Sequence, residues 1–303
     1  MASTDPSLLA RIFTPGPTRD NHPAGGATGK AGRNLVQAIT TAVVLIAAVA
    51  VPLFTSLPAF GGVIGFVCLV GIWELAGAFA RMGITLAVPP LYVGAIGIVT
   101  CAWWLGSEGT LFALYITVFV CAAWRLLDRR QESRMSDVVS TTFTAVYVPF
   151  LASFVVLMLA AWQNPWVFVV FELMVIANDT GGWAAGVLFG KHPMAPALSP
   201  KKSWEGFVGS ALTAVGVGTV GLWWLGAAWW WGIIAGVSIA FVGTMGDLTE
   251  SMIKRESGLK DMSQILPGHG GVLDRVDALL MSAPVAYFIF AWALPGVSWE
   301  SRH

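Results

Sequence analysis

Residues 138–162 read VVSTTFTAVYVPFLASFVVLMLAAW, a stretch without a single charged side chain. A helix of about 20 apolar residues spans the ~30 Å hydrocarbon core of a bilayer, so this stretch predicts a membrane-spanning helix. Further apolar stretches lie on both sides of it, with short breaks between them. We therefore predict an all-α integral membrane protein with about nine transmembrane helices. The predicted spans cover residues 35–55, 58–80, 84–105, 110–127, 138–162, 165–189, 204–226, 228–250 and 272–295.

The composition of the whole chain agrees with this prediction. Of its 303 residues, 56% are hydrophobic and only 11% are charged, whereas a soluble domain carries about 25% charged residues. The low charge excludes a soluble globule, a disordered chain and a nucleic-acid-binding protein, because each of these depends on charge. Residues 1–33, rich in Pro, Gly, Thr and Asn, are predicted to form a disordered cytoplasmic tail, and residues 34–303 a single polytopic membrane domain.

The placement of the charges predicts the orientation of the spans. Seventeen Lys and Arg balance seventeen Asp and Glu. With nine spans, every cationic residue except Arg302 lies on the side of the N-terminus, and the positive-inside rule makes that side cytoplasmic. Tryptophans gather in the opposite loops, as expected at a membrane interface. These are Trp103, Trp104, Trp162, Trp166, Trp223, Trp224, Trp229, Trp230 and Trp231.

The loop after the fourth span alternates cations with acids. We interpret it as a solvated, salt-bridged helix end that lies over the lipid surface, with no catalytic role. Its charged residues are Arg125, Asp128, Arg129, Arg130, Glu132, Arg134 and Asp137.

Two polar segments on the predicted cytoplasmic side, 178–206 and 246–277, interrupt the apolar pattern. In the second segment, two pairs of acids are each spaced i, i+3, so that the members of a pair share a helix face. Carboxylates from two helix ends that face a cation-rich loop are suited to hold Mg²⁺ together with a phosphate. The paired acids are Asp247 with Glu250, and Asp274 with Asp277.

The same residues also allow plainer interpretations. Asp274 and Asp277 could cap the last helix and pair with Arg275 and Lys254, since acids complement the dipole at a helix N-terminus. Glu74 and Glu172 lie in predicted spans without an evident partner, either as packed acids or as part of a polar cavity.

Cations and glycines in these segments favour phosphate binding. The run Pro267–Gly271 precedes the last span, and glycines at a helix N-terminus let backbone N–H groups approach an anion; a plain turn is the alternative. His269 between these glycines is suited to contact phosphate or to transfer a proton. Lys201 and Lys202 could equally touch anionic lipid headgroups, and Ser203 could begin the seventh span.

Residues 251–277, SMIKRESGLKDMSQILPGHGGVLDRVD, resemble the signature of phosphatidate cytidylyltransferases, the CDP-diacylglycerol synthases. The family pattern is S-x-φ-K-R-x₄-K-D, followed by H-G-G-φ-x-D-R-φ-D, where φ is apolar. The first segment is also similar, with N-D-T-G at 178–181, F-G-K at 189–191, S-P-x-K at 199–202 and E-G at 205–206. Val187 departs from the family, which frequently has Arg at that position. The resemblance covers roughly residues 140–295.

The resemblance implies a metal-dependent nucleotidyl transfer in phospholipid biosynthesis. CTP and phosphatidic acid would give CDP-diacylglycerol and pyrophosphate. By this resemblance, Asp247 and Asp274 are metal ligands with Asp277 and Glu250 in support, and Asp247, Asp274, Asp277 and His269 are catalytic. Asp179, Lys201, Lys202 and Ser203 would form the CTP pocket, whereas Lys254, Arg255, Lys260, His269 and Arg275 would hold the phosphates shared between CTP and lipid.

The expected cofactor is Mg²⁺, with a second cation left open. The expected partners are CTP, phosphatidic acid from the cytoplasmic leaflet and membrane lipids, with no nucleic acid and with a homodimer left open. The resemblance places the protein in a bacterial plasma membrane with its active site facing the cytoplasm. Two other functions compete with this one: a CTP-dependent lipid kinase acting on a polyprenol-type alcohol, and a cation-coupled transporter that uses intramembrane acids.

Overall fold

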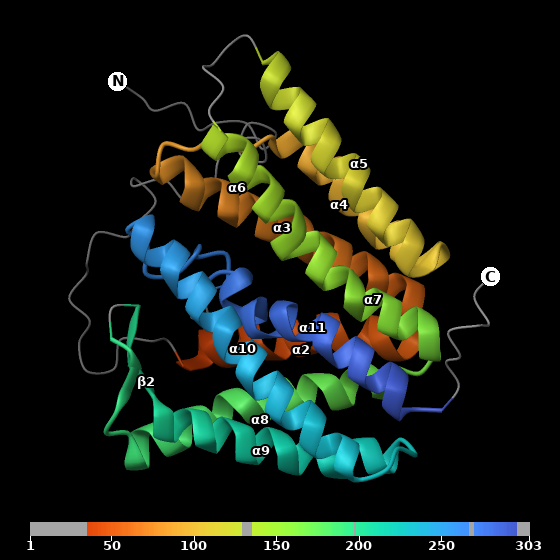
Figure 1. Ribbon diagram of the computed structural model, residues 1–303, viewed down its shortest axis with the longest axis vertical. Helices are drawn as coiled ribbons and strands as arrows, with labels where there is room; N and C mark the ends of the chain where they lie inside the picture. Colours follow the sequence, from red (N-terminus) through yellow and green to blue (C-terminus); the bar gives the residue numbers. More distant parts are fainter. Residues whose placement is uncertain (1–34, 129–134, 197, 267–269, 296–303) are drawn as a thin grey trace.

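The computed structural model describes residues 35–128, 135–196, 198–266 and 270–295, and the predicted tail of residues 1–33 lies outside them. The described chain is almost entirely helical (Figure 1). In the numbering of Figure 1, the helices before the polar segments are α2 (Leu35–Thr55), α3 (Leu57–Arg81), α4 (Val88–Trp104), α5 (Gly106–Leu127), α6 (Met135–Ala145), the π-helical turn η2 (Val146–Phe150) and α7 (Leu151–Trp162). Those that follow are α8 (Pro165–Phe189), α9 (Trp204–Trp224), α10 (Trp230–Glu256) and α11 (Leu273–Ala293).

A helix lies at each of the nine predicted positions. Within the described residues, seven helices are long and apolar enough to cross a membrane, and two shorter apolar helices cover Thr40–Thr55 and Val88–Trp104. The protein is thus an all-α membrane protein, and the number nine for its spans stays a prediction. The largest difference in boundary is at α10, which continues to Glu256 instead of ending near residue 250, so that Lys254 and Arg255 are helical.

Local sequence explains where several helices begin and where one is distorted. Asn164 accepts a hydrogen bond from Trp166 N at 3.0 Å and is followed by Pro165, a residue favoured in the first turn of a helix. Pro149 lies in η2, inside the uncharged stretch of residues 138–162. Proline has no N–H to donate, so one turn widens to a π-helix and the helix continues through α7.

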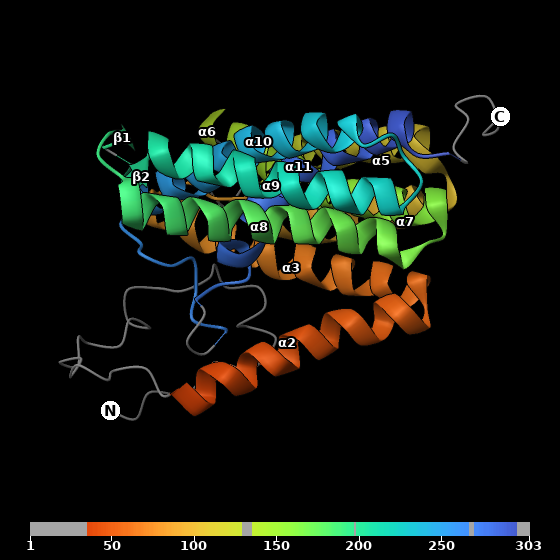
Figure 2. The ribbon, with the colours of Figure 1, turned by 90° about the horizontal axis from the view of Figure 1, so that it is seen from below.

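Each of the helices α8 to α11 packs against the next one in the sequence, and α11 also contacts α7 (Figures 1 and 2). Small residues allow the closest of these approaches. A Cβ placed on Gly181 of α8 would lie 2.7 Å from Gly209 O of α9, and a Cβ on Gly209 would lie 2.7 Å from Gly181 O. Such pairs of small residues bring helix backbones together in membrane proteins. Figure 2 shows α2 lying to one side of this bundle, next to α3.

A short antiparallel hairpin connects α8 to α9, and the all-α prediction did not include it. Its strands are β1 (Pro193–Ala195) and β2 (Ser199–Ser203), with Pro193 opposite Ser203. Glu205 at the start of α9 fastens the hairpin, because its carboxylate accepts hydrogen bonds from Lys191 N at 3.1 Å and His192 N at 3.2 Å. The same carboxylate pairs with His192 Nδ1 at 2.5 Å.

The interpretation of the loop after α5 as a solvated helix end is wrong for two of its residues. The Arg125 side chain is only 2% exposed and pairs with Asp137, whose side chain is 4% exposed. Asp137 also accepts a hydrogen bond from Thr85 N at 2.9 Å, so the pair ties α5 and α6 to the segment before α4. The two charges are buried because α5, α6 and the segment before α4 converge around them. The charge pattern along the sequence does not show which elements pack together. Arg129, Arg130, Glu132 and Arg134 lie outside the described residues.

Asp137→Ala should strongly destabilise the protein, because it leaves the guanidinium of Arg125 buried without its main counter-charge. Breaking a buried pair in this way costs about 3–5 kcal/mol. Asp128→Ala is the matched control, since Asp128 pairs with the same guanidinium at 3.0 Å but its side chain is 24% exposed. Thermal unfolding in detergent should show a clearly lower midpoint for Asp137→Ala than for Asp128→Ala. Equal midpoints would contradict the assignment of the buried pair as a structural tie.

Candidate active site

A cavity of about 440 Å³ lies where α8, α9, α10, α11 and the hairpin meet. It brings the two polar segments together, although they are separated by two membrane helices in the sequence. Ten of the predicted site residues line it: Asp179, Lys201, Lys202, Ser203, Asp247, Glu250, Lys254, Asp274, Arg275 and Asp277. The cavity therefore combines acids and cations from both segments, as the charge pattern indicated.

The close packing of α10 on α11 places two acids of the cavity side by side. A Cβ on Gly246 would lie 2.6 Å from Asp277 O, so only glycine allows α10 to approach α11 this closely. The next residue, Asp247, consequently lies close to Asp277, and the two carboxylates repel each other. Lys202 of the hairpin pairs with Asp247 and offsets part of this repulsion.

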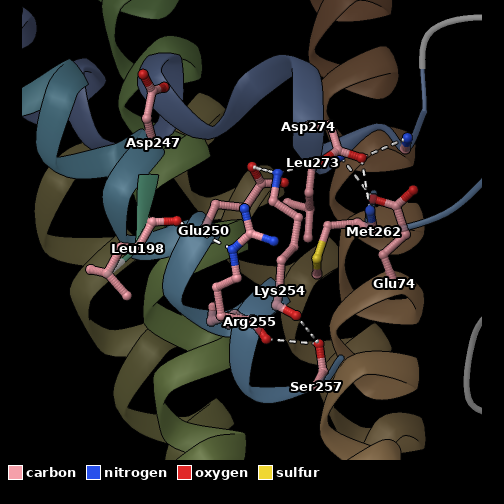
Figure 3. Close-up of polar contacts among 12 residues, drawn as sticks. Glu74, Leu198, Asp247, Glu250, Lys254, Arg255, Ser257, Met262, Leu273 and Asp274 are labelled. Atoms are coloured by element: carbon pink, nitrogen blue, oxygen red, sulfur yellow. Dashed lines mark hydrogen bonds and ion pairs between the residues drawn. The ribbon is translucent and has the colours of Figure 1, made fainter. Parts of the chain in front are cut away.

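Lys254 is the centre of a second charge cluster (Figure 3). Its Nζ donates to Glu250 Oε2 at 2.6 Å and to Asp274 Oδ1 at 2.7 Å. Glu250 and Asp274 are almost fully buried, with side chains 2% and 5% exposed. One cation thus joins two buried carboxylates from neighbouring helices, as expected for residues four apart on α10 with α11 alongside.

Asp274 also holds the loop that precedes its own helix. Its Oδ2 accepts hydrogen bonds from Met262 N and Gly271 N, both at 2.8 Å (Figure 3). The plainer interpretation of Asp274 is therefore confirmed for its pairing with Lys254, but not for the cap, because Asp274 accepts from N–H groups that precede α11. Asp274 lines the cavity together with Asp247 and Asp277, but both of its carboxylate oxygens already accept hydrogen bonds from the protein.

The donor set of the cavity fits a divalent cation that is shared with a phosphate. Within the described chain, no group of three or more His, Cys, Asp or Glu side chains could hold a metal ion by itself. Mg²⁺ is usually bound through one or two carboxylates plus waters and substrate phosphates. Asp247 and Asp277 supply two adjacent carboxylates, and Glu250 adds a buried Oε1 atom without a hydrogen-bond partner. An oxygen of this kind is a ready ligand for a cation.

Three predicted residues do not line the cavity or lie outside the described residues, whereas Ser203 lines the cavity and also begins α9, as its alternative interpretation predicted. Ser203 lines the cavity, but its Oγ caps α9 by accepting from Gly206 N at 3.1 Å. Arg255 and Lys260 are exposed and do not line the cavity, and Arg255 Nε donates to Leu198 O at 3.2 Å. His269 lies outside the described residues.

Several lining residues were not expected from the sequence. Thr244 lies one helical turn before Asp247, and Ser210 lies one turn after Gly206, so both share a helix face with residues of the motifs. Ser210 Oγ donates to Asn178 O at 2.7 Å and thereby joins α9 to α8. The i, i+3 and i, i+4 spacing from the motif residues would have found these two. Met194, Trp183 and Phe207, which also line the cavity, gave no comparable signal.

Comparison with known proteins identifies the family of the chain. Residues 36–293 match the model of the cytidylyltransferase family. A protein of Mycobacterium tuberculosis strain H37Rv named phosphatidate cytidylyltransferase is 37% identical over 277 residues, which cover 86% of this chain and 84% of the relative. Proteins of the same name from Mycobacterium leprae and Haemophilus influenzae are 35% and 33% identical. The alignments cover 95% of this chain and 98% of the M. leprae protein, and 84% of this chain and 99% of the H. influenzae protein.

The family match spans both polar segments, so the residues that build the cavity all lie within the matched region. The match also includes α3, α4 and α5, which lie before residue 140 and for which the sequence motifs gave no specific resemblance. The chain therefore belongs to the cytidylyltransferase family.

Proposed function

We propose that the protein is a phosphatidate cytidylyltransferase, which converts CTP and phosphatidic acid into CDP-diacylglycerol and pyrophosphate. An oxygen of the lipid phosphate attacks the α-phosphorus of CTP, and the bond from that phosphorus to the bridging oxygen of the β-phosphate breaks. The observation that carries the proposal is the single cavity in which acids and cations of α8 to α11 meet, in a chain of this family.

The cations of the cavity can offset the repulsion between the two negatively charged substrates. Both substrates are polyanions, so their charges must be offset before the phosphate groups can approach in line. Lys201, Lys202 and Arg275 line the cavity and are suited to bind phosphate oxygens. Lys202 would exchange its contact with Asp247 for a phosphate, and Asp179 and Asn178 would contact CTP from α8.

The acids of the cavity would hold the metal. Asp247 and Asp277 are the proposed direct ligands, supported by Glu250 and Asp274, and a second cation stays within the proposal. When bound, Mg²⁺ would supply additional charge neutralisation at the phosphates. Lys254 donates hydrogen bonds to both Glu250 and Asp274 and thereby keeps the two buried carboxylates in place.

The proposed orientation places the cavity at the cytoplasmic surface. Exposed Lys260 lies on the same end of the bundle as the cavity, at the predicted positive-inside face. The tryptophan pair Trp166 and Trp224, with ring centroids 5.4 Å apart, lies where α8 begins and α9 ends, at the predicted outer face. Phosphatidic acid would then come from the cytoplasmic leaflet, and the membrane would be the plasma membrane of a bacterium.

The purified protein should form a cytidine-containing lipid and pyrophosphate only when CTP, phosphatidic acid and Mg²⁺ are all present. Mass spectrometry of the lipid product with labelled CTP measures this directly. A lipid kinase would instead yield a phosphorylated lipid without cytidine, and a transporter would yield no new lipid. Either result would reject the proposed function.

Asp277→Asn should weaken binding of the divalent cation and lower turnover, because it removes one of two adjacent charged ligands. The loss in kcat should be about 100-fold or more, as for removal of other electrostatic contacts to a transition state. Mn²⁺ titration followed by electron paramagnetic resonance measures binding without activity. Glu256→Gln is the control, since Glu256 is exposed on the last turn of α10 outside the cavity. Unchanged Mn²⁺ affinity in Asp277→Asn would remove this residue from the metal site.

A thiol-labelling experiment tests the orientation. In a cysteine-free background, Lys260→Cys should react with a membrane-impermeant maleimide only from the cytoplasmic side, and Ala228→Cys only from the opposite side. Both positions are exposed, at opposite ends of α10. The reverse pattern in sealed vesicles of known orientation would overturn the proposed topology.

A further inference from the structure

Glu74 of α3 lies outside both polar segments, yet its carboxylate contacts the start of α11. Its Oε1 accepts a hydrogen bond from Val272 N at 2.8 Å and its Oε2 accepts one from Leu273 N at 2.8 Å. Ser263 Oγ donates to the same carboxylate at 2.5 Å. Glu74 is fully buried, at 0% exposure. A buried carboxylate is strongly disfavoured unless it is hydrogen-bonded, and here three donors compensate it.

This contact supplies the cap that α11 does not provide for itself. The residue at its N-cap position is Val272, whose side chain cannot accept a hydrogen bond. The N-terminal N–H groups of a helix need acceptors, and negative charge is favoured there. Glu74 provides both from a helix that is almost 200 residues earlier in the sequence.

The cap is continuous with the contacts of Asp274. Three successive backbone N–H groups donate hydrogen bonds to carboxylates. Gly271 N donates to Asp274, and Val272 N and Leu273 N donate to Glu74. A Cβ on Gly271 would lie 2.6 Å from Glu74 Oε1 and 3.0 Å from Asp274 Oδ2, so both carboxylates need a glycine at this position. Glu74 therefore holds the piece of backbone from which Asp274 projects (Figure 3).

We infer that Glu74 is a positioning residue for the reaction, acting through the backbone of residues 271–273. By fixing the first turn of α11, it sets the direction in which Asp274 meets Lys254 and in which Arg275 and Asp277 enter the cavity. Because α3 packs on α4 and α7, these earlier helices help to hold Glu74, and through it the start of α11, in position. The predicted effect of Glu74 on turnover rests on the proposed function, whereas its contacts with the backbone of α11 do not.

Glu74→Gln tests the inference, because it keeps the size of the side chain but removes the charge and turns one acceptor into a donor. Turnover should fall about 100-fold, the loss expected when a reacting group is displaced by about 1 Å. The affinity for Mn²⁺ should fall as well, because Asp277 lies one turn beyond the cap. Glu74→Asp keeps the charge with a shorter reach and should restore part of the turnover.

Two control variants separate positioning from general stability. Ser263→Ala removes one donor to Glu74 but leaves both contacts to α11, so it should retain turnover close to that of the unmodified protein. Asp137→Ala destabilises the bundle far from α11, and its folded fraction should keep its turnover and Mn²⁺ affinity. If Glu74→Gln behaves like Asp137→Ala in these two measurements, the residue is only structural and the inference is overturned.

Hydrogen exchange gives a readout that depends on neither metal nor substrate. The amides of residues 271–277 should exchange faster in Glu74→Gln and at an unchanged rate in Ser263→Ala. If the unmodified protein made no CDP-lipid, the proposed function would fail while this measurement still tested the cap. Unchanged exchange in Glu74→Gln would overturn the positioning role whatever the activity.

Discussion

Two buried carboxylates, Glu250 and Asp274, share the single ammonium group of Lys254, and the geometry of the cavity depends on this shared ion pair. Removing charged groups from water is costly, and the cost is recovered only where partners and hydrogen bonds are well placed. Because these residues come from α10 and α11, the pair also fixes how the two helices lie against each other. The positions of Asp247 and Asp277 follow from that packing.

The repelling acids nearby suit the proposed chemistry. Asp247 and Asp277 lie close together, and Lys202 pairs with Asp247. Two acids this close favour a bound cation, because an opposite charge stabilises their ionised forms. In the proposed site, the cation would be shared between these carboxylates and the phosphates of the substrate.

The features that could be predicted from the sequence are those with a local physical signal. Stretches such as 138–162 identified the helices because hydrocarbon thickness sets their length, and i, i+3 spacing correctly placed Asp247 with Glu250 on one face of α10. The predicted solvent exposure of Arg125 was wrong, because its burial comes from the convergence of three elements. The partners of Glu74 could not be predicted, since the donors lie almost 200 residues away. Long-range partners leave no trace in a local pattern.

The sequence by itself determined that the protein is a helical membrane protein, which residues carry its few charges, and which family signature they form. Those properties depend on hydropathy, charge and spacing along a single helix. Only the tertiary structure decided that Arg255 lies outside the cavity and that Glu74 caps α11. A polar side chain can serve as a cap, a structural tie or a substrate contact, and which of these it becomes depends on the donors and acceptors that the packing of other helices brings within hydrogen-bond distance.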